Sequence, residues 1–368
     1  MTTGRTVRIH GNMWAALPAG LSAGAVDLQQ RVDRLPIVIL HAHSDCNCRC
    51  AMCDIWKTRS HREVPIERVR AWLPELRSLG VERVVLTGGE PLMHSGFPEL
   101  LALLRGAGLA VTVLSSGLLV AHQAEALVRF ADEIIVSLDG PALLHDAIRG
   151  VPRAFERLAE GVGEIRRRAG RALPIKARCT VQRANCEHLV ATVDAARSIG
   201  LDGLSFLAVD THTEAFERTA TAATAATGRL SELLPTSEQL PTLAAEIAAL
   251  EGHHAEAFAT GYIAERPDKL RRRLLQYFRA TLGEAPFPGV DCNAPWLSMV
   301  VETDGTVRPC FFHRPYARLG DTDAANAFDA ILNGPAALAW RGRLDVRADA
   351  TCQRCVCNLV WKDPAGSA

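Results

Sequence analysis

His41-Ala-His-Ser-Asp-Cys-Asn-Cys-Arg-Cys-Ala-Met-Cys-Asp-Ile-Trp-Lys57 is the segment with the most restrictive residue spacing in the chain. It contains Cys46, Cys50 and Cys53, and it directly follows the apolar run Ile37-Val-Ile-Leu40, which predicts a buried strand. An iron–sulfur cluster held by cysteine normally takes one thiolate per iron. Three thiolates at this strand-to-loop junction therefore leave one iron of such a cluster open to a ligand that is not protein.

A zinc site or a chance cluster is the alternative interpretation, because Cys-x2-Cys alone is also zinc spacing. A zinc site needs a fourth ligand nearby. His41, His43 and Cys48 are the residues of the segment that offer one.

Composition excludes several classes of protein. The chain has 368 residues, 48% hydrophobic and 22% charged, which is enough for one large domain and a smaller one. The chain has 41 basic residues (Lys and Arg) and 41 acidic residues (Asp and Glu). It therefore has no excess of positive charge that would indicate binding to nucleic acid or to an anionic membrane surface. No apolar stretch reaches the roughly 18 residues of a membrane span. We therefore expect a cytoplasmic protein with no nucleic-acid or membrane partner.

The chain has eleven cysteines, which in a cytoplasmic protein favour metal or redox sites over disulfides. They gather toward the two ends, with none between Cys186 and Cys292. Two separate cysteine sites are therefore expected.

Short β-branched runs alternate with amphipathic stretches from residue 37 to about residue 209. The expected strands are Ile37–His41, Arg83–Thr87, Ala110–Ser115, Glu133–Leu138, Ile175–Val181 and Leu204–Val209. The expected helices are Pro65–Leu79, Phe97–Gly106, Val120–Phe130, Ala154–Arg168 and Cys186–Ile199. This alternation predicts a parallel sheet with right-handed crossovers, in which the carboxyl ends of the strands share one mouth.

Polar and glycine residues stand at the predicted strand ends. Thr87-Gly-Gly-Glu-Pro91 follows the second strand, and Ser115 and Ser137 end the third and fourth. Asp210 and His212 follow the sixth strand, so they are expected to face the mouth and are candidates for catalytic residues, although a capping Asp and a surface His are commoner.

The second cysteine set has the pattern Cys292-x12-Gly305-x4-Cys310, then Cys352-x2-Cys355, with Cys357 close behind. Asp304-Gly305 predicts a hairpin that brings Cys292 and Cys310 together. Four such cysteines suit either an iron–sulfur cluster or a tetrahedral zinc ion. The spacing leaves open whether Cys355 or Cys357 is the fourth ligand. His313 is expected to be packed or exposed to solvent rather than to be a ligand.

The Cys-x3-Cys-x2-Cys spacing, with Met52 before the last cysteine, resembles the signature of the radical S-adenosylmethionine (SAM) superfamily. The resemblance implies an open six-stranded partial TIM barrel, with a 4Fe–4S cluster on Cys46, Cys50 and Cys53 whose open iron chelates SAM. The second cysteine set resembles a Twitch domain, a shortened SPASM domain with one auxiliary 4Fe–4S cluster. By the same resemblance, the SAM contacts come from Met52, Gly88, Gly89, Glu90, Ser115, Ser137 and Arg149.

The expected fold is therefore an α/β partial (β/α)6 barrel followed by a small domain made of a β-hairpin and a helix. We expect an N-terminal extension at 1–36, the barrel at 37–210, a helical linker or cap at 211–290 and the auxiliary-cluster domain at 291–368. The Thr/Ala-rich stretch Thr219–Gly228 lies within the linker or cap.

The expected function is cleavage of SAM to a 5′-deoxyadenosyl radical, which abstracts hydrogen from a small-molecule metabolite. The auxiliary cluster relays an electron, so oxidation or dehydrogenation is favoured, with epimerisation or rearrangement left open. The resemblance also implies an electron donor such as flavodoxin or ferredoxin. One alternative is a peptide maturase, which is disfavoured because only 36 residues precede the first strand. Another is a non-catalytic iron–sulfur or zinc interaction protein.

Overall fold

The structure is a computed structural model that describes residues 30–58, 60–218, 228–320 and 327–360. Most of the expected N-terminal extension and nearly all of the Thr/Ala-rich stretch lie outside the described residues. The predicted α/β fold with a parallel sheet is confirmed. No helix in the described ranges is both long enough and apolar enough to cross a membrane.

Six parallel strands form the barrel part of the sheet, each within two residues of its expected bounds. They are β1 (Ile37–His43), β2 (Arg83–Gly88), β3 (Ala110–Ser115), β4 (Glu133–Ser137), β5 (Ile175–Val181) and β6 (Gly203–Ala208). Each strand pairs in parallel with the next along the chain. The carboxyl ends of all six strands therefore meet at one edge, as the alternation of strands and helices predicts.

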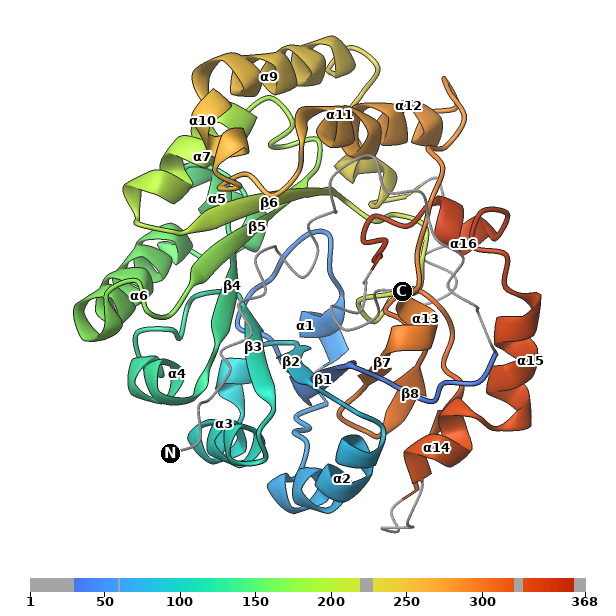
Figure 1. Cartoon of the computed structure of the whole chain (residues 1–368). Helices are drawn as coiled ribbons and strands as arrows, with labels where there is room; N and C mark the ends of the chain where they lie inside the picture. The colour runs from blue at the N-terminus through green and yellow to red at the C-terminus, as the bar shows by residue number, and fades with distance from the viewer. Residues whose placement is uncertain (1–29, 59, 219–227, 321–326, 361–368) are drawn as a thin grey trace.

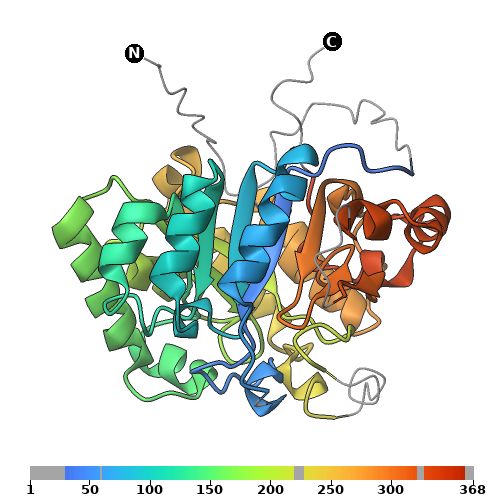
Figure 2. The ribbon, with the colours of Figure 1, turned by 90° about the horizontal axis from the view of Figure 1, so that it is seen from below.

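Helices cover the outer face of this curved sheet (Figure 1). They are α2 (Ile66–Ser78), α3 (Phe97–Gly106), α4 (Ala124–Phe130), α6 (Ala154–Ala169) and α7 (Leu189–Ser198). Helix α3 illustrates why they pack there: Phe97, Leu100, Leu101 and Leu104 are all fully buried, at the spacing of one helix face. Figure 2 shows several of these helices side by side against the strands. Helix α5 (Ala142–Arg149) follows β4 and lies at the mouth of the barrel, where Arg149 lines the cavity described below.

Two helices begin later than expected. Residues ahead of α4 and α7 form hydrogen-bonded turns, in which Val120 N–H donates to Gly117 O and Cys186 N–H donates to Gln182 O. The short elements α1 (Ile55–Thr58) and η1 (Pro91–Met93) lie in the loops after β1 and β2. They sit at the mouth of the barrel, beside the first cysteine set.

Residues 228–290, which belong to the expected linker or cap, are mainly helical. The elements are η2 (Ser231–Leu233), α9 (Leu240–His253), α10 (Ala255–Ala259), α11 (Pro267–Leu270), the π-helical turn η3 (Arg271–Gln276) and α12 (Tyr277–Thr281). They pack around the β6 edge of the sheet (Figure 1).

The C-terminal strands extend the barrel sheet, which the sequence did not predict. Among the described residues the sheet has the order β6-β5-β4-β3-β2-β1-β7-β8-β9. The added strands are β7 (Ser298–Val301), β8 (Thr306–Arg308) and β9 (Ala317–Arg318). Strand β7 is buried throughout and pairs in parallel with β1, while β8 returns antiparallel through the predicted Asp304-Gly305 turn. The two cysteine regions are therefore joined through adjacent strands.

The described residues of the C-terminal region also contain α13 (Ala294–Leu297), α14 (Ala327–Leu332), α15 (Pro335–Arg343) and α16 (Ala350–Gln353). These helices lie at the β1–β8 side of the molecule, coloured orange to red in Figure 1. The expected small domain of hairpin and helix is confirmed.

Candidate functional site

A cavity of about 440 Å³ opens at the carboxyl ends of the strands. All three cysteines of the first set line it, as do most of the other predicted cofactor residues: Met52, Gly88, Gly89, Ser115, Ser137 and Arg149. Its volume falls within the ~300–1,000 Å³ that is usual for small-molecule sites. The common mouth predicted from the strand order is therefore the place where these residues meet.

The cysteine loop is fixed by bonds from several elements. Arg49 N–H donates to Arg149 O at 2.9 Å, and the indole N–H of Trp56 donates to Cys50 O at 3.2 Å. The Arg149 guanidinium also lies 3.7 Å from Cys50 Sγ. A hydrogen bond from the Cys48 thiol, together with this guanidinium, lowers the pKa of Cys50, whereas burial raises the pKa of Cys53 to about 12.

The spacing of the thiols decides between a single zinc ion and a cluster. Among the described residues, only His313, Asp349 and Cys352 have ligand atoms that all lie within 4.8 Å of one another. Ligands about 2.3 Å from one tetrahedral zinc ion lie about 4 Å apart. Neither cysteine set contains three sulfur atoms that all lie within 4.8 Å of one another. The donor sets thus suit a multinuclear cluster, in which each thiolate binds a different iron.

Two glycines let the β2 loop run against the cysteine loop. Gly88 has a φ of +124°, and a Cβ there would lie 2.5 Å from His43 O. At Gly89 a Cβ would lie 2.1 Å from Asp45 O. The N–H groups of Gly89 and Glu90 instead donate to His43 O and Asp45 O, both at 2.8 Å. This backbone pairing positions the loop that begins the cysteine set.

Glu90 is fully buried and does not line the cavity. Its carboxylate accepts hydrogen bonds from the Ser115 hydroxyl, from both the hydroxyl and the N–H of Ser116, and from Leu92 N–H. Burial raises its pKa, and these hydrogen bonds oppose that shift. In this arrangement Glu90 orients Ser115, which does line the cavity. The expected direct contact between Glu90 and SAM stays a prediction.

Arg149 reaches the cavity from the last turn of α5. Its Nη2 pairs with Asp139 Oδ2 at 2.5 Å, and the Asp139 side chain is completely buried at the end of β4. Burial alone would lower the pKa of Arg149, but Asp139 and Cys50 raise it. Asp139 Oδ1 also accepts from Thr180 N–H at 2.9 Å, which ties β5 to the pair. The guanidinium is therefore held beside the cysteine loop.

The two candidate catalytic residues lie in different places. Asp210 lines the cavity, where its carboxylate pairs with Arg218 at 2.8 Å. Arg218 also donates to Met52 O at 2.5 Å, so the pair connects β6 to the cysteine loop. The His212 ring instead packs edge-on against Phe287 at 6.3 Å and is not in the cavity wall. No sequence motif indicated Arg218.

The second cysteine set surrounds a small pocket next to the main cavity. Cys292, Cys310, Cys352, Cys355 and Cys357 all line this pocket, and Cys357 lines the main cavity as well. Burial raises the pKa of Cys310 to about 12, and it raises the pKa of Cys355, with further contributions from three of the other cysteines. The hairpin and α16 thus bring the thiols together, as the spacing predicts.

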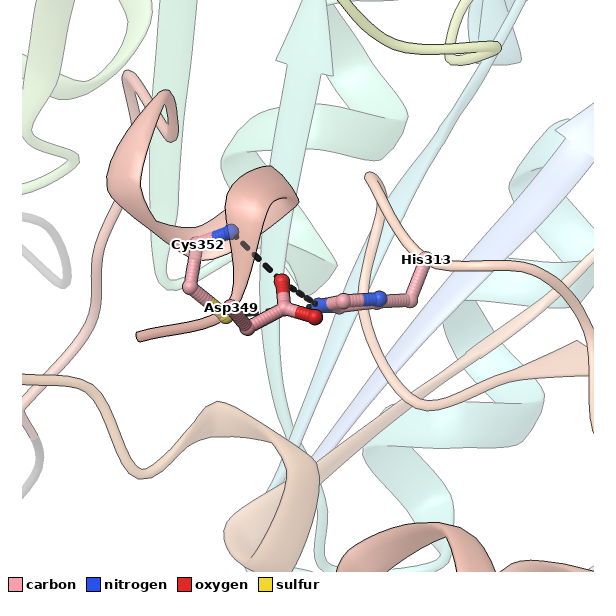
Figure 3. Close-up of side chains that lie close together, drawn as sticks. All are labelled: His313, Asp349 and Cys352. Carbon is pink, nitrogen blue, oxygen red and sulfur yellow. Dashed lines mark hydrogen bonds and ion pairs between the residues drawn. The ribbon is translucent and has the colours of Figure 1, made fainter. Parts of the chain in front are cut away.

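His313 lies beside this site, although the sequence analysis did not count it among the cluster ligands. Its Nε2 lies 3.3 Å from Cys352 Sγ and 3.6 Å from Asp349 Oδ1 (Figure 3). Only its closeness to Cys310 in the sequence signalled such a position. The expected packed environment is present, because the imidazole is 9% exposed, but the ring faces the cysteines.

Comparison with protein families assigns both regions. Residues 43–196 match the model described as the radical SAM superfamily, and residues 292–356 match the SPASM model, described as an iron-sulfur cluster-binding domain. The chain therefore contains a radical SAM domain and a SPASM domain. The resemblance inferred from the cysteine spacing is confirmed.

Relatives of this radical SAM domain include enzymes with different substrates. The chain is 32% identical over 160 residues to the AdoMet-dependent heme synthase of Methanosarcina barkeri (strain Fusaro / DSM 804), a match that covers 42% of the chain and 45% of the relative. It is 28% identical over 254 residues to the PqqA peptide cyclase of Ruegeria pomeroyi (strain ATCC 700808 / DSM 15171 / DSS-3), with coverage of 68% and 60%. The chain spans about half the length of the first relatives it matches.

Solved structures that bind S-adenosylmethionine share the fold. Streptococcus suis SuiB bound to S-adenosylmethionine superposes with a TM-score of 0.62 at 13% identity, covering 89% of this chain and 73% of SuiB. Native anSMEcpe with bound AdoMet gives a TM-score of 0.61 at 17% identity, covering 88% of each chain.

The radical SAM domain implies a 4Fe–4S cluster with SAM, and the SPASM domain implies an auxiliary iron–sulfur cluster, so both predicted kinds of cofactor are confirmed. The residues fit these groups by their chemistry, since the three thiols of the first set line the main cavity and five thiols line the second pocket.

We expect Gly89→Ala to reduce cluster loading at the first site to near zero. The added Cβ would collide with the backbone at Asp45, so the cysteine loop would have to move. Gly163→Ala is the matched control, because a Cβ there lies 3.7 Å from its nearest neighbour, in the middle of α6. Iron analysis should show about half the iron in the Gly89 variant and the full content in the control. Full loading of both would contradict the role given to Gly89.

Proposed function

We propose that the chain cleaves SAM reductively and abstracts hydrogen from a small-molecule metabolite, with the auxiliary cluster relaying an electron. The observation that carries the proposal is the placement of Cys46, Cys50 and Cys53 on one wall of the 440 Å³ cavity. When bound, SAM and its cluster supply a 5′-deoxyadenosyl radical. The protein contributes orientation of that cofactor and exclusion of side reactions.

In this proposal, Cys46, Cys50 and Cys53 hold the SAM cluster. Arg149 and Ser137 bind the carboxylate and ribose of SAM, and the glycine loop receives its amino end. A guanidinium suits this task because its donors match a carboxylate in pairs. The other proposed SAM contacts are Met52, Ser115 and, through Ser115, Glu90. Asp210, which lines the cavity, is the proposed catalytic residue. His212 is the weaker candidate, because its ring packs against Phe287 outside the cavity wall.

We propose Cys292, Cys310, Cys352 and Cys355 as the ligands of the auxiliary cluster, with Cys357 as the alternative to Cys355. Four thiolates close the coordination sphere, which leaves electron transfer as the natural task of this cluster. Cys357 supports the relay, because it lies in the walls of both the main cavity and the auxiliary pocket. An oxidation or dehydrogenation follows from such a relay, with epimerisation or rearrangement as redox-neutral alternatives.

A low-potential donor such as flavodoxin or ferredoxin is the proposed source of the first electron. We also propose that the protein works in the cytoplasm, where thiols stay reduced. All eleven cysteines lie within the described residues and are free thiols there.

A peptide maturase is the second candidate function. The match to a peptide cyclase extends over 68% of the chain, more than the match to the heme synthases. The heme synthases favour a small molecule instead, and so does the volume of the cavity, which is that of a usual small-molecule site. A non-catalytic iron–sulfur or zinc protein is the third candidate. The buried guanidinium of Arg149 beside the cysteine loop argues against it.

Transfer of deuterium tests the proposed function. Reduced protein with SAM is incubated with deuterated candidate metabolites and, separately, with deuterated candidate peptides. We expect a metabolite to transfer deuterium into 5′-deoxyadenosine, detected by mass spectrometry. Transfer from a peptide alone would support the maturase instead, and transfer from neither class, with SAM cleavage intact, would contradict the metabolite assignment for the compounds tried.

Arg149→Ala is expected to weaken SAM binding by about 1.5–3 kcal/mol, the size of a hydrogen bond to a charged group, with both clusters retained. The single variant also leaves the buried Asp139 carboxylate without its ion-pair partner. The comparison is therefore repeated in an Asp139→Asn background, where the amide oxygen still accepts from Thr180 N–H. Equilibrium binding should show the same loss in both backgrounds. A loss confined to the single variant would mean that Arg149 acts only by neutralising Asp139.

A further inference from the structure

The environment of His313 shows a feature that the cluster ligands alone do not explain. The imidazole packs edge-on against Trp340, with ring centroids 4.9 Å apart, and directs Nε2 toward α16. Figure 3 shows the ring end-on to Asp349 and Cys352. Nε2 lies 3.3 Å from Cys352 Sγ and 3.6 Å from Asp349 Oδ1.

Asp349 has a separate task in this group. It is the N-cap of α16, and its Oδ1 accepts from Thr351 N–H and Cys352 N–H, both at 2.9 Å. This cap orients the turn that carries Cys352. The carboxylate oxygen nearest to His313 is therefore already used within the cap of α16.

The chemistry of a bound thiolate determines the proton on His313. A metal-bound cysteine has lost its proton and can only accept a hydrogen bond. The Asp349 carboxylate is also an acceptor. Both groups that face Nε2 therefore require a donor there, so a proton lies on Nε2.

We propose that His313 is a positioning residue whose Nε2–H donates to the Cys352 thiolate and raises the reduction potential of the auxiliary cluster. Hydrogen bonds to cluster sulfurs are one determinant of potential, because they stabilise the more negative, reduced state. This inference rests on the proposed assignment of Cys352 as a cluster ligand. The consequence is an auxiliary cluster that accepts an electron more readily.

The test measures the potential of the auxiliary cluster alone. The background is the full chain with Cys46, Cys50 and Cys53 replaced by Ala, so that the signal of the SAM cluster is absent. His313→Phe keeps a ring against Trp340 but removes the donor. His313→Gln places an amide N–H at a similar reach. Trp340→Phe changes the packing around the imidazole and keeps the donor.

In a potentiometric titration followed by EPR, we expect the Phe variant to shift the ratio of reduced to oxidised cluster about tenfold toward oxidised, equivalent to 59 mV for one electron. The Gln variant should restore most of the potential, and Trp340→Phe should retain it. An unchanged potential in the Phe variant would overturn the proposal, as would an equal shift in Trp340→Phe.

Nitrogen labelling separates a hydrogen bond from direct ligation. With 15N-histidine, pulsed EPR of the reduced cluster should show a weak nitrogen coupling that disappears in the Phe variant. A strong coupling typical of a bound nitrogen would overturn the proposal by making His313 a ligand. If no cluster forms in the triple-Ala background, the assignment of the auxiliary ligands fails, and the proposal fails with it. A cluster that forms with an unchanged potential contradicts the inference alone.

Discussion

Replacing Cys46, Cys50 and Cys53 together by Ala should remove about half of the iron, four of roughly eight atoms in two 4Fe–4S clusters, and all SAM cleavage. These thiols line the cavity, and their loop is held by backbone bonds to Gly89 and Arg149 that do not depend on the sulfurs. The fold and the second cluster should therefore survive. Iron analysis and detection of 5′-deoxyadenosine measure the two effects.

Cys186→Ala is the matched control for this loss. Cys186 is fully buried, but its thiol only donates to Arg183 O at 3.5 Å, away from both cysteine sets. It should retain full iron and SAM cleavage. Cleavage that persists in the triple variant would end the assignment of the first cysteine set.

Replacing Cys352 and Cys355 by Ala should abolish turnover of the true substrate while SAM cleavage by dithionite-reduced protein stays measurable. The barrel already contains the elements proposed for SAM cleavage, and the two cysteines lie in the separate auxiliary pocket. Hydrogen abstraction precedes the electron step, so deuterium from labelled substrate should still reach 5′-deoxyadenosine. Product analysis beside 5′-deoxyadenosine analysis separates the two steps.

Formation of product at the wild-type rate in this variant would make the auxiliary cluster structural and would contradict the oxidative assignment. Loss of SAM cleavage together with turnover would show that the cluster supports the first step instead. The control is Cys179→Ala, which alters a fully buried thiol of β5 outside both pockets.

The barrel could be predicted because its signals are local. Strand ends such as Thr87-Gly88-Gly89 combine a β-branched run with turn residues, and α3 carries its buried leucines at helix spacing. The pairing of β7 with β1 could not be predicted in the same way. Residues 37 and 298 meet through a register that depends on the whole fold, and the hydrophobic run Ser298–Val301 indicates burial but no partner.

Some site residues were likewise predictable from local sequence, whereas others depend on contacts between distant segments. The spacing of Cys46, Cys50 and Cys53 indicated a cluster, because the ligands of such a site come from one short segment whose residue types and spacing can be recognised in the sequence. The orientation of Glu90 beneath Ser115 and the approach of His313 to Cys352 depend on contacts between distant segments. Sequence predicted that a carboxylate follows β2, and the structure shows that its oxygens are used within the protein.

Formation of 5′-deoxyadenosine is the measurement that tests the central claim most directly. Anaerobically reconstituted full-length protein is reduced with dithionite in the presence of SAM, and 5′-deoxyadenosine and methionine are quantified together. The account predicts both products in equal amounts, dependent on reductant and absent from the Cys46/Cys50/Cys53→Ala variant. Protein loaded with both clusters that binds SAM but forms neither product would contradict it.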